Sequence, residues 1–80
     1  MLQPILRMPK VIATSGYARS TVYLRIEQRL WPKPIKLGKR AMGFTENEVS
    51  EMNAARIAGK TDAEIRALVL RLEAARKAVV

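Results

Sequence analysis

The chain has 80 residues, enough for one small domain, and it contains neither histidine nor cysteine. Their absence removes the commonest general base, the usual zinc ligands and every disulfide, so we expect no catalytic residue, no metal and no cofactor. The net charge of +8 lies entirely in residues 1–44, which carry nine Lys or Arg residues and one acid, Glu27, whereas residues 45–80 carry six of each sign.

The basic first half predicts a polyanionic partner. On a folded domain it indicates nucleic acid or an anionic membrane surface, although charge alone fits an ordinary basic soluble protein equally well. Residues 1–10 contain no long apolar run and are interrupted by Pro4 and Pro9, so we expect no signal peptide. No segment approaches the run of about 20 apolar residues that a membrane span needs. We therefore expect a cytoplasmic protein.

Two short helices are predicted in the first third of the chain. Pro9 suits the first turn of a helix and Gly16 suits the left-handed position after its end, which gives about two turns between them. A second helix over about residues 19–30 follows, with an inward stripe made by Val22, Ile26 and Leu30. The tight turn between them indicates a helix-turn-helix, and periodicity alone fits a plain helical hairpin equally well.

A two-stranded hairpin is predicted next. Residues 33–37 alternate, with Ile35 and Leu37 on one side and Lys36 on the other. Residues 38–40 form the turn, which makes the tip basic, and residues 41–44 form the returning strand. A hairpin of this size is unstable alone, so we expect it to pack on the helices.

Two capping boxes start the last two helices. Thr45 and Glu48 form the first, and we expect its helix to reach about Ala58 with Val49, Met52 and Ile57 facing inward. Residues 61–64 form the second, which opens a helix to the C-terminus. Because these boxes and the helix dipole account for most acids, few carboxylates remain for chemistry.

The terminal helix is apolar on two sides. One side predicts a core stripe of Ile65, Leu68, Val69, Leu72, Ala75 and Val79. The other side suggests packing on a second copy of the chain, and an alanine-rich face in contact with solvent explains it equally well. The residues of this candidate oligomerisation face are Ala63, Ala67, Leu70, Ala74 and Ala78.

Several segments resemble the AlpA family of prophage regulators, relatives of phage excisionases and of MerR-type winged domains. The matching runs are RMPKVI at residues 7–12, SGYARSTVY at 15–23, WPKPIKLG at 31–38 and RAMGF at 40–44, and the similarity extends over about residues 5–58. The sequence departs from the family at two places. Ala18 stands where a capping Ser is common, and Arg29 stands where a Gly is common.

The resemblance implies a mainly helical fold with a small β-hairpin. This is a winged helix-turn-helix over residues 1–59, in the order helix, helix, hairpin, helix, followed by an extra C-terminal amphipathic helix over residues 60–80. It also implies a sequence-specific transcriptional regulator of a prophage or mobile element, bound to double-stranded DNA at the bacterial nucleoid. An excisionase-like recombination directionality factor is the alternative with the same fold.

The resemblance implies that the second helix enters the major groove of DNA, and that the hairpin follows the neighbouring DNA backbone or the minor groove. Arg19 is the candidate for reading guanine, while the hydroxyl groups nearby bond phosphates. Tyr23 could instead be a partly buried aromatic, Arg25 a solvated cation, and Trp31 and Phe44 are expected in the core. The candidate DNA-binding residues are Arg19, Ser20, Thr21, Tyr23, Arg25, Lys36, Lys39 and Arg40.

A basic membrane-surface or protein-interaction module is the alternative from a different class. It predicts a basic amphipathic helix with large apolar residues opposite the cations. Here the cations are spread over one helix and a hairpin tip, which favours DNA.

Overall fold

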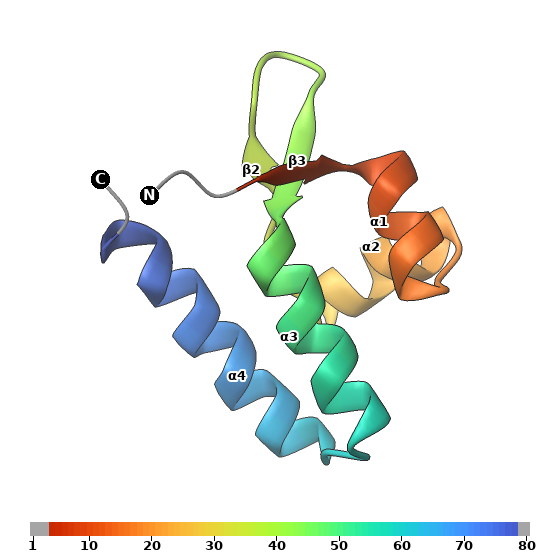
Figure 1. The fold of residues 1–80 in the computed structure, drawn as a ribbon, viewed down its shortest axis with the longest axis vertical. Coiled ribbons are helices and arrows are strands. Elements are labelled where there is room, and N and C mark those ends of the chain that lie inside the picture. The colour runs from red at the N-terminus through yellow and green to blue at the C-terminus, as the bar shows by residue number, and fades with distance from the viewer. Residues whose placement is uncertain (1–3, 79–80) are drawn as a thin grey trace.

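Four helices and a three-stranded antiparallel sheet make up the computed structural model, which describes residues 4–78 (Figure 1). The predicted mainly helical fold with a small sheet is confirmed, and its arrangement is compatible with a winged helix-turn-helix. In chain order the elements are β1 (Ile5–Arg7), α1 (Met8–Ser15), α2 (Arg19–Glu27), β2 (Ile35–Lys36), β3 (Met42–Thr45), α3 (Glu46–Ile57), α4 (Asp62–Ala75) and a 3-10 turn (Arg76–Ala78).

Proline and glycine set the ends of α1 as expected. Pro9 lies in the first turn, and Gly16 has φ 77° and donates its N–H to the carbonyl of Ile12 at 3.2 Å. The helix α2 starts without a comparable stabilising residue. Ala18 occupies its N-cap in an extended conformation, and no side chain caps the helix. The poor cap noted in the sequence is therefore a feature of the fold.

The helix α2 ends at Glu27, so the expected end at about residue 30 is wrong. Arg29 has φ 63°, the only positive φ of a non-glycine residue in the described part of the chain. The N–H of Leu30 donates to the carbonyl of Arg25 at 2.8 Å, and that of Arg29 to Ile26 at 3.1 Å. These two bonds form a Schellman motif, with Arg29 where glycine is usual. The turn directs the chain toward Trp31.

The sheet has one strand more than the predicted hairpin. β3 is its central strand and pairs with both β1 and β2 in antiparallel register. Gly43 lies opposite both Arg7 and Ile35, and a Cβ atom there would stand 2.8 Å from Ile5 Cγ2 and from the carbonyl oxygen of Leu6. Glycine at this position therefore lets β1 approach, which two-residue alternation could not reveal.

Both capping boxes are formed. Thr45 Oγ1 accepts from the N–H of Glu48 at 3.1 Å and Thr61 Oγ1 from that of Glu64 at 3.2 Å, with both carboxylates reaching back to the threonine N–H. Two hydrogen bonds lower the pKa of the Glu64 carboxyl: the larger effect comes from the bond with the Thr61 N–H and the smaller from the bond with the Thr61 side chain.

The expectation that Ile57 faces inward is wrong, because its side chain is 87% exposed and Ala55 takes the buried position on α3.

One hydrophobic core joins all parts of the fold. Its largest fully buried side chains include Trp31 and Phe44, as expected, with Met52 from α3. The helix α4 lies beside α3 (Figure 1) and adds three side chains to this core, Ile65, Val69 and Leu72. Leu68 packs against it, Ala75 is exposed, and Val79 lies outside the described residues.

An ion pair between the partly exposed Arg76 and the buried Glu48 ties the 3-10 turn after α4 to the body of the fold. Arg76 Nε donates to Glu48 Oε2 at 2.6 Å and Arg76 Nη2 to Glu48 Oε1 at 2.9 Å, while Nη2 also donates to the carbonyl of Lys33 at 2.7 Å. Glu48 therefore caps α3 and anchors the segment after α4.

Among residues 4–78, no helix is both long and apolar enough to cross a membrane.

Candidate nucleic-acid interface

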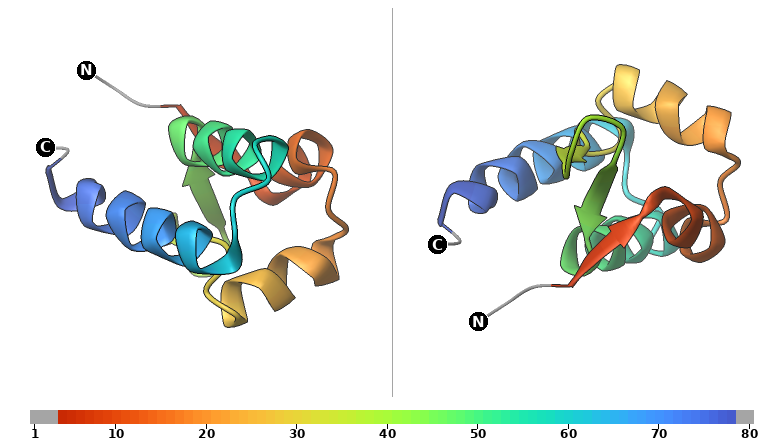
Figure 2. Two further views of the ribbon diagram at one scale, coloured as in Figure 1. Left: turned by 90° about the horizontal axis from the view of Figure 1, so that it is seen from below. Right: turned by 90° about the horizontal axis from the view of Figure 1, so that it is seen from above.

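The helix α2 lies on the opposite side of the molecule from α3 (Figure 2). Val22 is fully buried and Ile26 half-buried, so these two side chains fix which face of α2 points inward. Arg19, Ser20 and Tyr23 are exposed, as a DNA-facing helix requires. This face therefore presents three of the predicted site residues to solvent.

A contact between α2 and β3 joins this helix face to the hairpin. The hydroxyl of Tyr23 donates to Met42 Sδ at 3.7 Å. Lys36 lies opposite Met42 in the β2–β3 register, so their side chains share one face of the sheet. The structure thus brings Tyr23 and Lys36, which are far apart in the sequence, to the same surface.

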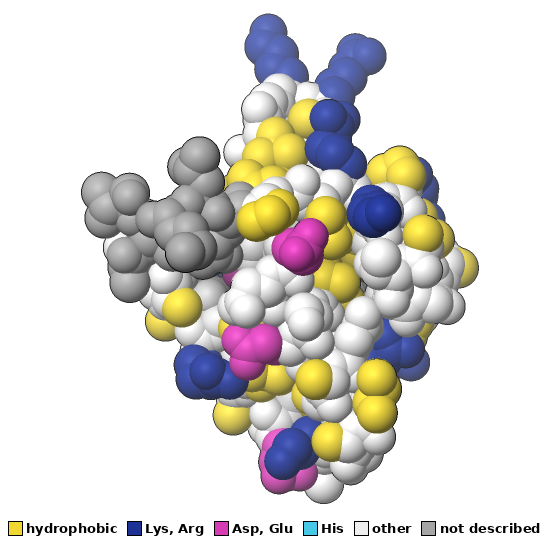
Figure 3. Space-filling view, viewed as in Figure 1, with side chains coloured by type: hydrophobic (Ala, Val, Ile, Leu, Met, Phe, Trp, Pro, Cys, Tyr) yellow, Lys and Arg dark blue, Asp and Glu magenta, His cyan; other side chains and the backbone are white. Residues whose placement is uncertain are grey.

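The hairpin tip is basic and stands clear of the body. Lys39 and Arg40 are both exposed. Lys and Arg side chains project from the end of the hairpin in Figure 3. Both side chains are therefore accessible to a partner.

Two predicted site residues are less accessible than the others. Thr21 is half-buried, and so is Arg25, whose Nη1 donates to Gln28 Oε1 at 2.8 Å. The Arg25 guanidinium also lies 5.8 Å from the centre of the Tyr17 ring. These contacts hold Arg25 along the flank of α2.

A support for the turn between α1 and α2 was missed from the sequence. Arg56 on α3 donates from Nη1 to the carbonyl of Ser15 at 2.8 Å, and its guanidinium lies 4.0 Å from the Tyr17 ring centre. Asn53 donates to the carbonyl of Thr14 at 3.0 Å. These groups satisfy carbonyls that the end of α1 leaves free. Sequence patterns did not indicate these two contacts, because Asn53 and Arg56 lie about 40 positions away from the turn that they support.

The cations of the first half are not neutralised within the fold. Residues 4–78 contain two ion pairs, Arg71–Glu51 and Arg76–Glu48, and both lie in the neutral second half. The positive charge on α2 and the hairpin therefore faces outward, as an interface for a polyanion needs.

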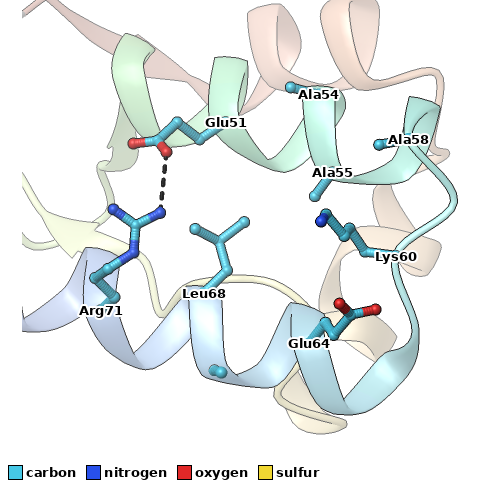
Figure 4. Close-up of a pocket in the computed structure, with 9 residues that line it drawn as sticks. Glu51, Ala54, Ala55, Ala58, Lys60, Glu64, Leu68 and Arg71 are labelled. Atoms are coloured by element: carbon cyan, nitrogen blue, oxygen red, sulfur yellow. Dashed lines mark hydrogen bonds and ion pairs between the residues drawn. The ribbon is translucent and has the colours of Figure 1, made fainter.

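A groove lies elsewhere, between α3 and α4 (Figure 4). Alanines and Leu68 form its walls, and the Glu51–Arg71 ion pair of 3.2 Å closes one end. Glu64 lies at the other end with Lys60, and the Glu64 carboxylate serves the capping box. Within residues 4–78, acidic side chains do not cluster in threes that could hold a metal ion.

The outer face of α4 is open to solvent in this chain. Ala63, Ala67 and Ala74 are exposed, and Leu70 is 60% exposed. The side chain of Ala78 lies outside the described residues. The face predicted for self-association is thus accessible.

Comparison with known proteins identifies the family of this chain. The model described as "Prophage CP4-57 regulatory protein (AlpA)" matches residues 4–57, from the start of the sheet to the end of α3. A relative from Enterobacteria phage P4, named "Uncharacterized protein ORF88", is 36% identical over 55 residues. The aligned part covers 69% of this chain and 62% of that relative. No solved structure matches. The resemblance inferred from the sequence motifs is confirmed.

Proposed function

The chain belongs to the AlpA family of prophage regulatory proteins, and we propose that it acts by binding double-stranded DNA through α2 and the β2–β3 hairpin. One observation carries this proposal. The Tyr23–Met42 contact joins α2 to the hairpin in a single surface whose cations have no acidic partner within residues 4–78. Duplex DNA offers the matching charge and a groove for a helix.

The dimensions of α2 fit the major groove. Nine residues give a helix about 13 Å long, comparable with the groove width of about 12 Å. Arg19 at its start donates twice to guanine O6 and N7, which discriminates between bases by about 1–3 kcal/mol. Ser20, Thr21 and Tyr23 bond phosphates and position the helix.

The hairpin makes the second set of contacts. Lys36, Lys39 and Arg40 follow the adjacent backbone or minor groove, and Arg25 on the flank of α2 reaches a phosphate. These contacts are electrostatic, so they strengthen binding to every duplex and weaken as salt increases. Residues 1–59 thereby form the DNA-binding unit.

Residues 60–80 act as scaffold and as a contact for a second copy. Support comes from the outer face of α4, where Leu70 and its neighbouring alanines are exposed in the described part of the chain. Sedimentation of the full chain at high concentration tests this contact. We expect a dimer that Leu70→Glu dissociates, and a strict monomer for the unaltered chain contradicts it.

The bound DNA determines which regulatory role applies. We favour transcriptional control of integrase or excision genes, with excision control at an attachment site as the second role, and a place at the bacterial nucleoid in either case. Footprinting of the full chain on DNA of the element that encodes it tests the proposal. Protection over a promoter supports the first role, and protection over an attachment site supports the second.

Failure of the chain to bind duplex DNA would overturn the proposal. If no duplex is protected at low salt and vesicles with anionic lipid bind the chain instead, the basic surface serves a membrane. The proposal includes no catalytic step.

A further inference from the structure

The outward face of α2 carries a stripe of three exposed residues, Ser20, Leu24 and Glu27. Each lies between about 140° and 200° around the helix from the buried Val22. This stripe therefore points directly away from the core. Two of its members, Leu24 and Glu27, have no explanation in the packing or electrostatics of the fold.

Leu24 is a large apolar side chain on the solvent side of α2. It is 47% exposed, and it does not belong to the hydrophobic residues that form or cover the core. Because about half of this side chain is exposed, a polar residue at this position would cost the fold little apolar burial. Its position indicates an apolar contact made outside the chain.

Glu27 is unusual for its charge. It is the one acid of residues 1–44 and stands at the last residue of α2, where the helix dipole disfavours a negative charge. Within residues 4–78 its carboxylate makes neither an ion pair nor a hydrogen bond. Phosphates repel a carboxylate, so on a helix that binds DNA its favourable place is over the bases, away from both backbones.

We infer that Leu24 and Glu27 read base edges in the major groove, Leu24 by covering the methyl group of a thymine and Glu27 by accepting from the N4 amino group of a cytosine. The inference rests on the proposed function, because it requires α2 to lie in the groove. Apolar side chains contact thymine methyl groups and carboxylates accept from cytosine in this groove. Arg19 then supplies guanine contacts from the start of α2, and Glu27 supplies specificity from its end.

The thymine contact is tested with duplexes selected from a random library by the full chain. Each thymine of the preferred site is replaced in turn by uracil, which lacks only the methyl group. At one position we expect the wild-type chain to lose about fourfold in affinity, the value of one buried methyl group. Leu24→Ala binds the thymine and uracil duplexes equally. Ile57→Ala, which removes an exposed aliphatic side chain from α3, keeps the fourfold difference.

The cytosine contact is tested by Glu27→Gln, with Glu46→Gln as the control for the loss of one exposed negative charge. We expect Glu27→Gln to lose the preference for cytosine at one position of the selected site, while Glu46→Gln keeps the wild-type base preference. Both variants bind random duplexes somewhat more tightly because their net charge is higher.

The outcomes separate this inference from the proposed function. If the wild-type chain binds no duplex, both are wrong. If it binds a preferred site and Leu24→Ala keeps the uracil penalty, or Glu27→Gln keeps the cytosine preference, the corresponding reading role is wrong while DNA binding stands. Binding without any base preference also overturns the inference.

Discussion

The hydroxyl of Tyr23 on α2 lies 3.7 Å from Met42 Sδ on β3, and this contact places the hairpin beside the outward half of the helix. Lys36 shares the sheet face of Met42. A partner that covers Tyr23 therefore meets the hairpin as well. This relationship supports the proposal that residues of two separate sequence motifs bind one duplex.

Arg19 and Lys39 have different expected roles. Arg19→Ala should relax the base preference, because a bidentate guanine contact is lost. Lys39→Ala should weaken binding to specific and random duplexes by the same factor, since a phosphate contact carries no sequence information. Competition binding with both duplexes measures the two ratios. An equal loss on both duplexes for Arg19→Ala would show that Arg19 does not read bases.

The missing cap of α2 can be restored. Ala18→Ser places a hydroxyl that accepts from the free N–H groups of the first turn, and it should raise the free energy of unfolding by about 1 kcal/mol. Urea denaturation measures this gain. Ala13→Ser, an exposed position inside α1, is the matched control and should not stabilise the chain. A gain no larger than the control's would mean that Ala18 is not the effective cap position.

Gly43 is required by the close approach of β1. Gly43→Ala should lower the free energy of unfolding by about 1–3 kcal/mol, because its Cβ would stand 2.8 Å from a backbone oxygen that cannot rotate away. Gly38→Ala meets no atom within 4 Å and should leave stability nearly unchanged. Thermal unfolding of both variants checks the difference. Equal melting temperatures would contradict the packing of β1 against β3.

The Arg76–Glu48 pair should stabilise far more than Arg71–Glu51. Arg76→Ala leaves the buried Glu48 carboxylate without its cation, at a cost of about 3 kcal/mol, the lower end for buried pairs because Arg76 is partly exposed. Arg71→Ala breaks a pair in contact with solvent and should cost less than about 1 kcal/mol. Chemical denaturation compares them. Similar losses would show that the turn after α4 is not anchored at Glu48.

Local signals predicted most of the helices, and long-range contacts account for what was missed. Pro9, Gly16 and the two threonine caps act within a few residues, so the sequence around them was sufficient. The strand β1 depends on pairing with β3 far along the chain, and three residues carry no periodic signal of their own. The end of α2 was misplaced because Arg29 adopts a backbone conformation for which only glycine would have been a clear indicator.

The candidate site shows the same division. Exposure of Arg19, Lys39 and Arg40 follows from their place at a helix start and a hairpin tip. The role of Arg56 on α3, which supports the turn before α2, could not be predicted, because no sequence pattern near Arg56 indicates its contact with Ser15.

The most direct test of the DNA-binding surface compares the salt dependence of duplex affinity for two double variants. Lys39→Ala with Arg40→Ala removes two charges from the hairpin tip, and Lys60→Ala with Lys77→Ala removes two exposed charges from the second half. Each lost phosphate contact lowers the slope of log affinity against log salt by about 0.9. The hairpin variant should therefore lose about 1.8 in slope while the control keeps the wild-type slope. Equal slopes for the two variants would contradict the assignment of the hairpin to DNA.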